Sequence, residues 1–314
     1  MSEFMKTCIG IDTSNYTTSA ALVSGGEVTV NSKKLLPVRP GEVGLRQSDA
    51  VFHHVQQLAE VLAPVLEKAG KPVAVGVSDR PRAVEGSYMP CFTVGKTVAT
   101  VLAQTHGVPL HLFSHQQGHI AAAVYSAGRL DLLNEKFLVF HVSGGTTEAL
   151  ISTPGADGTP QAQLVASSLD LKAGQAVDRV GVMLGLPFPA GPHLEQLALQ
   201  WHDKIKVRPV MKGCNCSLSG VENKCRAMME AGHPREEIAR YCLEFIRVSL
   251  SAMCTALLEE YGSLPVVFAG GVMSNSILRE SLSSRFGAYF AQPAFSADNA
   301  AGTAVLTARK EGLL

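Results

Sequence analysis

The sequence has no excess of charge of either sign. Its 314 residues include 27 Lys and Arg against 27 Asp and Glu, so the formal net charge is +0. A protein that grips nucleic acid on its own normally carries a basic patch or a high isoelectric point. The basic clusters here are modest, such as Lys204, Lys206, Arg208 and Lys212. The charge balance therefore argues against an autonomous binder of RNA or DNA.

Long apolar runs and a cysteine framework are also missing. No run approaches the roughly 20 apolar residues that a membrane span needs, and the N-terminus lacks the order of a signal peptide. The 7 cysteines are odd in number and scattered, with only Cys214 and Cys216 close together. This spacing argues against a disulfide framework and favours buried free thiols. We expect a cytoplasmic protein that does not bind membranes.

Strands and helices are predicted to alternate along the chain. Hydrophobic residues make up 46% of the sequence, which excludes a disordered or fibrous chain, and the length is about twice that of a typical domain. A pattern of strand, hydroxyl- or glycine-rich turn, strand, turn and strand begins near residue 7 and again near residue 137. Such a repeat predicts an α/β protein of two duplicated lobes.

Three turns could bind an anion. The first repeat contains the hydroxyl-rich turn 12–18, the second contains the turn 143–147, and Gly270-Gly271 follows a buried strand. Glycine and hydroxyl residues in such turns present backbone amides to phosphates. Together they favour a nucleotide cleft between the lobes, in which Asp12 could reach a metal, a hydroxyl or an amine. Asp178 could accept hydrogen bonds from a ribose, although the local sequence alone favours a solvated helix carboxylate.

The motif His115-Gln116-Gln117-Gly118-His119 places two imidazoles on one helix face. This spacing suits two-point ligation of one metal ion. A zinc peptidase would need Glu directly after the first His as its base, and Gln116 cannot take a proton from water. Asp298 is the best candidate for a third ligand, since two His and one carboxylate leave positions open for substrate. The pair His53-His54 is expected at the surface.

Several motifs resemble the TsaD family, the transferase subunit for tRNA N6-threonylcarbamoyladenosine, formerly called O-sialoglycoprotein endopeptidase. The resemblance covers nearly the whole chain in order, and the motifs that carry it are Gly10-Ile11-Asp12-Thr13-Ser14, His115-x-x-x-His119, Val142-Ser143-Gly144-Gly145-Thr146-Thr147, Ala173–Arg179, Leu184–Pro192, Ser217-Leu218-Ser219-Gly220, Gly270–Asn275 and Asp298-Asn299-Ala300-Ala301. It implies an ASKHA (actin, sugar kinase and Hsp70-like) fold. We expect an N-terminal lobe of residues 5–130 completed by 295–314, and a C-terminal lobe of residues 131–294.

The resemblance also implies a site and a reaction. In the family, the two His and the late Asp bind one divalent metal, usually iron or zinc, which points here to His115, His119 and Asp298. The residues implied to bind the adenine nucleotide, as threonylcarbamoyl-AMP, ATP, ADP or AMP, are Ser143, Gly144, Gly145, Thr146, Thr147, Asp178, Gly191 and Asn275. The implied reaction transfers a threonylcarbamoyl group to N6 of the adenosine that follows the tRNA anticodon. Asp12 is a candidate catalytic residue.

Some positions depart from the family's usual motifs and predict a diverged paralogue. Asp12 stands where the family usually has Glu, Thr146 where it has His, and Gln175 where it has Glu. Two alternatives therefore stay open: a phospho- or carbamoyltransferase that acts on a small substrate, and a non-catalytic nucleotide-binding subunit. The implied partners are tRNA, bound weakly by this chain alone, and TsaB-like and TsaE-like proteins, in a homo- or heterodimer or a larger complex.

Overall fold

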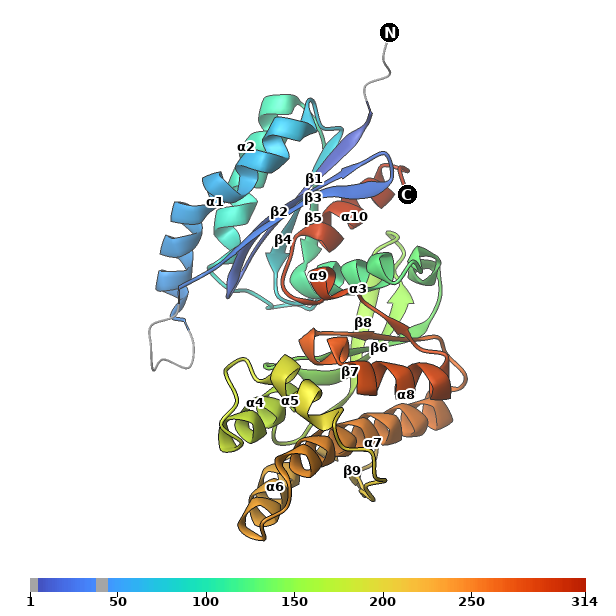
Figure 1. Ribbon diagram of the computed structural model, residues 1–314. Helices are drawn as coiled ribbons and strands as arrows, with labels where there is room; N and C mark the ends of the chain where they lie inside the picture. Colours follow the sequence, from blue (N-terminus) through green and yellow to red (C-terminus); the bar gives the residue numbers. More distant parts are fainter. Residues whose placement is uncertain (1–4, 38–44) are drawn as a thin grey trace. The chain divides into compact units, whose positions relative to one another are not determined.

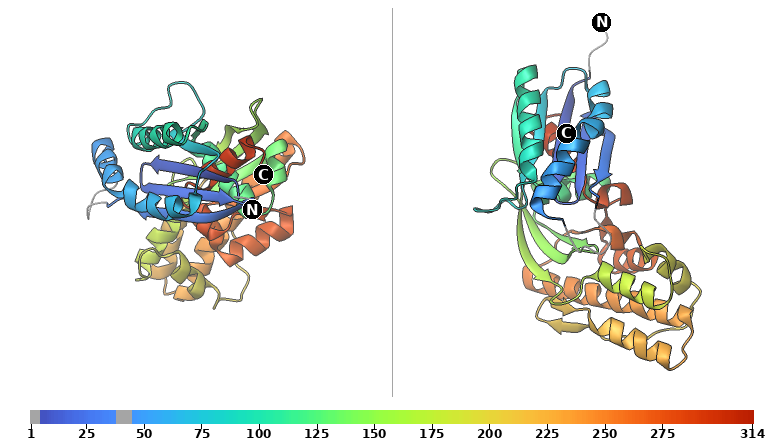
Figure 2. Two further views of the ribbon diagram at one scale, coloured as in Figure 1. Left: turned by 90° about the horizontal axis from the view of Figure 1, so that it is seen from above. Right: turned by 90° about the vertical axis from the view of Figure 1, so that its left-hand side faces the viewer.

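The computed structural model describes residues 5–37 and 45–314 (Figure 1). The chain forms two compact units. The first takes in the chain up to Asn134 together with Thr153–Ala162 and Ala294–Leu314, and the second takes in Glu135–Ser152 and Gln163–Pro293. Each unit is built around its own sheet with helices packed on it (Figure 2).

A five-stranded sheet in the order β3-β2-β1-β4-β5 forms the centre of the first unit. β2 pairs antiparallel with β1 and β3, whereas β4 runs parallel to β1 and β5. The strands are β1 (Thr7–Ser14), β2 (Thr17–Ser24), β3 (Glu27–Leu35), β4 (Ala74–Arg80) and β5 (Leu110–Ser114). The other elements are α1 (Gln47–Ala69), α2 (Phe92–His106), α3 (His115–Ser126), η1 (Leu130–Asn134), α9 (Pro293–Ser296) and α10 (Ala301–Lys310). In Figure 1, α1 and α2 cover one face of this sheet and α10 packs on the other.

The sheet of the second unit has the order β12-β11-β6-β7-β8. β6 pairs antiparallel with β7, and β11 runs parallel to β6 and β12. Its strands are β6 (Phe137–Val142), β7 (Thr147–Pro154), β8 (Pro160–Ser167), β11 (Val266–Ala269) and β12 (Tyr289–Phe290), with a separate hairpin of β9 (Val210–Lys212) and β10 (Asn215–Ser217). The helices are α4 (Ala173–Met183), α5 (Gly191–Ala198), α6 (Gly220–Glu230), α7 (Arg235–Tyr261), η2 (Gly271–Ser274) and α8 (Ser276–Phe286).

The two sheets share one topology. In each, the first strand of the repeat lies at the centre, its hairpin partner lies on one side, and parallel strands lie on the other. The strands β1 and β6 are buried along almost their whole length, which explains why both read as apolar runs in the sequence. The predicted α/β fold of two duplicated lobes is confirmed.

Helix α7 is long and apolar enough to cross a membrane by length and composition alone. Its apolar stretch is 56% buried inside the protein, and its inward side chains form part of the hydrophobic core of the second unit. A buried core helix passes the same test as a membrane span, so α7 is weak evidence for one. The sequence analysis expected no apolar run of this length, so α7 corrects that expectation.

Two local expectations differ from the structure. The segment expected as the turn 12–18 is mostly strand, because β1 runs on to Ser14 and pairs residue by residue with β2, leaving Asn15 and Tyr16 between them. Asp12 therefore lies inside a strand. The expectation of a surface position is wrong for His54, which is fully buried. The reason is its place in α1, four residues before the buried Leu58 and on the same face of the helix.

Candidate functional site

The first two turns of α3 present the histidines of the His-x-x-x-His motif. Ser114 caps this helix: its Oγ accepts a hydrogen bond from the Gln117 amide (3.2 Å), and Gln117 Oε1 accepts one from the Ser114 amide (2.8 Å). This capping box fixes where the helix begins and hence the direction of the first side chain. His115 and His119 lie one turn apart, and their Nε2 atoms are 2.9 Å from each other.

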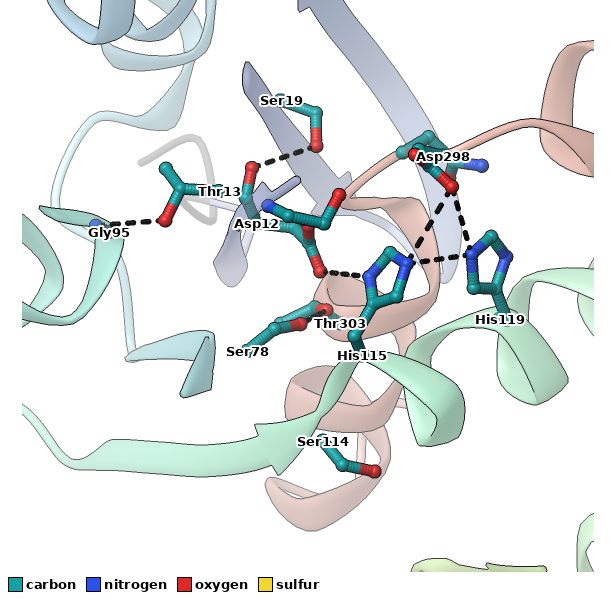
Figure 3. Close-up of polar contacts among 12 residues, drawn as sticks. Asp12, Thr13, Ser19, Ser78, Gly95, Ser114, His115, His119, Asp298 and Thr303 are labelled. Atoms are coloured by element: carbon teal, nitrogen blue, oxygen red, sulfur yellow. Dashed lines mark hydrogen bonds and ion pairs between the residues drawn. The ribbon is translucent and has the colours of Figure 1, made fainter. Parts of the chain in front are cut away.

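Asp298 reaches the two histidines because α10 packs very closely on its neighbours. A Cβ on Gly302 would collide with the backbone of Gly118 in α3, so the two helices touch through their main chains. Asp298 precedes α10 by three residues. Its Oδ1 lies 3.1 Å from His119 Nε2 and 3.6 Å from His115 Nε2 (Figure 3).

The ligand atoms of His115, His119 and Asp298 all lie within 4.8 Å of one another. Two neutral imidazole nitrogens cannot point their lone pairs at each other 2.9 Å apart, so a proton or a cation has to lie between them. All three side chains are partly accessible, at 20%, 17% and 28% of their surface. Two imidazoles and one carboxylate are a donor set that suits a divalent transition metal with open positions. This group could hold a metal ion.

Asp12 contacts the ring nitrogen of His115 that faces away from His119 and Asp298. Its Oδ2 lies 2.8 Å from His115 Nδ1, and its Oδ1 accepts a hydrogen bond from the Ser14 amide (2.9 Å). The side chain is 1% exposed. A carboxylate on the second ring nitrogen fixes the tautomer of a ligating histidine and makes it a better donor. The sequence pointed to Asp12 as a site residue but not to this contact.

The charges at this site reinforce one another. Burial raises the pKa of Asp12, but attraction to His115 and their hydrogen bond outweigh it and lower that pKa overall. Burial lowers the pKa of His115, whereas Asp12 and Asp298 raise it to about 10. The two histidines hold the pKa of the Asp298 carboxyl well below its usual range despite its burial. The site therefore favours a positive charge between its carboxylates.

His54 hydrogen-bonds to both ends of the turn that follows Asp12. The sequence analysis did not predict this role. Its Nε2 lies 2.9 Å from the carbonyl oxygen of Ser14, and its Nδ1 lies 2.8 Å from Thr18 Oγ1. Burial lowers the pKa of His54 overall, so the neutral ring donates from Nε2 and accepts at Nδ1. The signal that could have revealed it is its place on the apolar stripe of α1.

In the second unit, the turn 143–147 closes on itself. The Ser143 amide donates to the carbonyl of Thr146 (2.7 Å), and the Thr146 amide donates to Ser143 Oγ (3.1 Å). Gly144 and Gly145 are exposed at its tip, and a Cβ on either would meet nothing within 4 Å. The main chain at the tip is thus open to a ligand, as an anion-binding turn requires.

Two glycines from distant segments hold this turn in place. A Cβ on Gly174, at the start of α4, would lie 2.6 Å from Gly144 Cα. Gly270 has φ +100°, and a Cβ there would collide with the backbone of Val142. Both positions therefore need glycine, and they explain why the Gly270-Gly271 pair stands out in the sequence.

The other residues expected to bind the nucleotide have structural partners. Asp178 Oδ1 accepts a hydrogen bond from the amide of Ala190 (2.9 Å), which ties α4 to the residue before Gly191. Gly191 is half-buried, with open space where a Cβ would be. Asn275 caps α8, since its Oδ1 accepts from the Leu278 amide (3.1 Å). The structure brings Asp178 close to Gly191 but gives no direct contact between Asn275 and either of them.

Solved structures share this architecture at low sequence identity. Full-length HypF in its phosphate- and nucleotide-bound form superimposes with a TM-score of 0.59 at 13% identity, covering 98% of this chain and 46% of that one. Component A of the (R)-2-hydroxyglutaryl-CoA dehydratase of Acidaminococcus fermentans gives a TM-score of 0.54 at 15% identity, covering 98% and 99%. These likenesses define the class: the chain has the ASKHA fold.

Residues 29–305 match the family described as TsaD, tRNA N6-adenosine threonylcarbamoyltransferase, and the chain belongs to that family. A tRNA N6-adenosine threonylcarbamoyltransferase of Latilactobacillus sakei subsp. sakei is 30% identical over 302 residues, covering 90% of this chain and 83% of that protein. One of Thermofilum pendens is 29% identical, covering 87% and 78%. A probable bifunctional tRNA threonylcarbamoyladenosine biosynthesis protein of Thermoplasma volcanium is 27% identical, and the chain spans half of its length.

Proposed function

We propose that the protein is a metal-dependent transferase that moves the threonylcarbamoyl group of threonylcarbamoyl-AMP to N6 of the adenosine following the tRNA anticodon. The observation that carries this proposal is the group of His115, His119 and Asp298, braced by Asp12, in a chain that matches the family over residues 29–305. The resemblance of the sequence to TsaD is thus joined by a side-chain arrangement that suits the chemistry.

The reaction needs no nucleophile from the protein. The N6 amine attacks the carbamoyl carbon, a C–N bond forms, and the bond from that carbon to the phosphate oxygen breaks. AMP departs with the bonding electrons, and the amine gives up one proton. Because the mixed anhydride is already activated, the protein has to hold the donor and orient the amine. A metal held by His115, His119 and Asp298 would supply a Lewis acid for the donor's oxygen atoms.

Asp12 acts in this proposal as a positioning residue. Both of its oxygens are already engaged, by the Ser14 amide and by His115 Nδ1, and its side chain is buried. It therefore keeps the Nε2 of His115 directed toward Asp298 and does not touch the reacting atoms itself.

The adenine nucleotide is assigned to the second unit. Its residues would be those expected from the sequence, Ser143–Thr147, Asp178, Gly191 and Asn275. The open tip at Gly144 and Gly145 and its braced main chain support a phosphate there. HypF, which shares the fold, is described in a phosphate- and nucleotide-bound form. The lobe limits of 5–130 with 295–314 and 131–294 stay a prediction.

Partners and location follow from the same proposal. The proposed substrate RNA is tRNA. Some relatives are about twice as long and are named bifunctional biosynthesis proteins, which supports the proposal that this chain acts together with other proteins of the same biosynthesis. TsaB-like and TsaE-like proteins are the proposed partners. A chain with a net charge of +0 would bind tRNA weakly by itself. Its place is the cytoplasm, and iron or zinc is the proposed metal.

A second candidate is a carbamoyl- or phosphotransferase that acts on a small substrate. It is favoured by the residues that depart from the family's usual motifs, above all Asp12 and Thr146. The same metal group and the same turn would serve it, with a different acceptor.

The deciding experiment supplies the purified protein and its partner proteins with threonylcarbamoyl-AMP and unmodified tRNA, and measures the modified nucleoside by mass spectrometry. We expect modified adenosine from the wild type and none from His115→Ala. His202→Ala is the matched control, because this histidine is exposed and lies outside the metal group. If the wild type forms no product where an authentic family member does, the tRNA reaction is excluded.

A further inference from the structure

One segment of the second unit carries four exposed cations at alternating positions. Residues 204–212 alternate strictly between exposed and half-buried positions. The exposed positions are Lys204, Lys206, Arg208, Val210 and Lys212. The half-buried positions are Ile205, Val207, Pro209 and Met211, of which Val207 and Met211 pack against the hydrophobic core. We call the four cations the basic strip.

The backbone of the strip has regular strand structure at one end only, at Val210–Lys212. These residues form β9, and Met211 pairs with Cys216 of β10. The inward apolar side chains and this pairing prevent the segment from turning over, so the cations stay on the outer side.

The charges of the strip are not neutralised within the described residues. None of the four cations forms an ion pair there, and Asp203 is the one acidic residue within the segment 203–212. Arg247, which lies on α7 in the same unit, shows the contrast, because its guanidinium binds the carboxylate of Glu244 through two nitrogens. The whole chain has a net charge of +0, so these four unpaired cations make this segment positive relative to the rest of the protein.

A cavity of about 480 Å³ lies beside the strip. Pro209 and Arg285 line it together with Glu259, so its charges are mixed. Arg285 donates a hydrogen bond to Thr255 Oγ1 (3.2 Å), which uses one of its five N–H groups. The buried hydroxyl of Ser251 lines the same cavity and has no hydrogen-bond partner among the described residues. The space next to Arg208 thus offers further donors to a polar, anionic ligand.

We propose that the basic strip binds the sugar-phosphate backbone of the substrate tRNA. The inference rests on the proposed function, because that function supplies an RNA substrate. Exposed cations that alternate with half-buried apolar residues along one segment suit a polyanion such as the RNA backbone, and such contacts position RNA without reading its sequence. Four contacts are few, which agrees with the weak binding expected of the isolated chain.

The test is the binding of labelled unmodified tRNA to the full chain by fluorescence anisotropy between 50 and 200 mM salt. Wild type is compared with Lys206→Ala/Arg208→Ala and with the control Lys68→Ala/Lys71→Ala, whose lysines are also exposed and form no ion pair among the described residues. Each lost phosphate contact lowers the slope of log affinity against log salt by about 0.7 to 0.9. We therefore expect the strip variant to lose roughly 1.5 of slope and about tenfold in affinity at low salt.

Each outcome of this experiment either supports the proposal or overturns it. An unchanged slope in the strip variant, an equal loss in the control pair, or no binding of tRNA by the wild type at 50 mM salt would overturn the proposal. A polyglutamate peptide of comparable charge forms the second arm. If it binds the strip as tightly as tRNA and with the same loss in the variant, the surface serves an acidic protein partner and the RNA assignment is wrong. Because the assay measures binding alone, it stays informative if no modified adenosine is formed.

Discussion

The candidate metal group of the first unit and the glycine-rich turn of the second are built in opposite ways. The metal group consists of side chains from β1, α3 and the segment before α10, locked together by contacts of 2.8 to 3.6 Å. The turn 143–147 is one contiguous piece of main chain, and the glycines at its tip are exposed.

This contrast shows two ways to prepare a site. In a cluster of charged side chains each member fixes the protonation of its neighbours, so the cluster depends on every member. A main-chain turn offers amide groups whose positions depend on how closely other segments approach. The metal group should lose its function when one side chain is removed. The turn 143–147 should lose its function when one carbon atom is added to a glycine that packs against it. The predictions below test this difference.

Loss of one ligand should have the largest effect. We expect His115→Ala or Asp298→Ala to abolish stoichiometric metal binding while the fold persists, because two remaining ligands hold a divalent ion poorly. Elemental analysis of the purified variants, with circular dichroism for the fold, measures both. Full metal content in either variant would show that the ion binds elsewhere. His202→Ala should keep the metal content of the wild type.

Removing the charge behind His115 should have a smaller effect. Asp12→Asn keeps the shape and an oxygen that can accept the Nδ1 proton of His115, but it removes the negative charge. Loss of such an outer partner commonly weakens metal affinity 10- to 100-fold, and we expect a loss of about that size with an unchanged thermal midpoint. Competition with a chromogenic chelator gives the affinity. An unchanged affinity would mean that Asp12 does not position His115.

Metal affinity should also depend on pH in a direction set by His115. Its raised pKa, about 10, means that the metal-free protein carries this proton at neutral pH. The metal must displace it, so affinity should rise about tenfold per pH unit up to the region of that pKa and then level off. The metal-free protein should instead lose stability progressively as the pH rises from the ordinary histidine pKa of 6.5 to about 10. Chelator competition from pH 6 to 9 measures the first effect, and a flat profile would contradict it.

Adding a methyl group should disturb the second unit without touching any charge. Gly174→Ala would push a Cβ against Gly144 and should cost about 1 to 3 kcal/mol of unfolding free energy, as overpacking does. Gly145→Ala is the matched control, since its Cβ would meet open space, and we expect almost no loss of stability. Both variants should bind ADP more weakly in calorimetry. Equal stability of the two would show that the close approach of α4 is unimportant.

Much of the fold could be predicted because it depends on local patterns. Neighbouring residues alone indicate the apolar runs at β1 and β6 and the helix cap at Ser114. The repeat near residues 7 and 137 is likewise visible as two similar stretches, and the paired sheets confirm it.

The contacts within the site could not be predicted in the same way. Nothing near Asp12 in the sequence says that it faces His115, which is 103 residues away. The roles of His54 and Gly174 also depend on segments that meet only in the folded chain. Spacing identifies which residue types are available, whereas the partner of each one is a matter of long-range packing.

The sequence by itself determined the α/β class, the duplication, the family and the two histidines on one helix face, since each follows from periodicity or from an ordered set of motifs. Only the tertiary structure decided that Asp12 is buried behind His115, that Asp298 completes the group, and that glycines hold the turn 143–147. The structure also shows that Val207 and Met211, which alternate with the cations of the basic strip, pack against the core. The physical reason is that charge pairing and close packing join residues far apart in the chain, and no local pattern records which of them will meet.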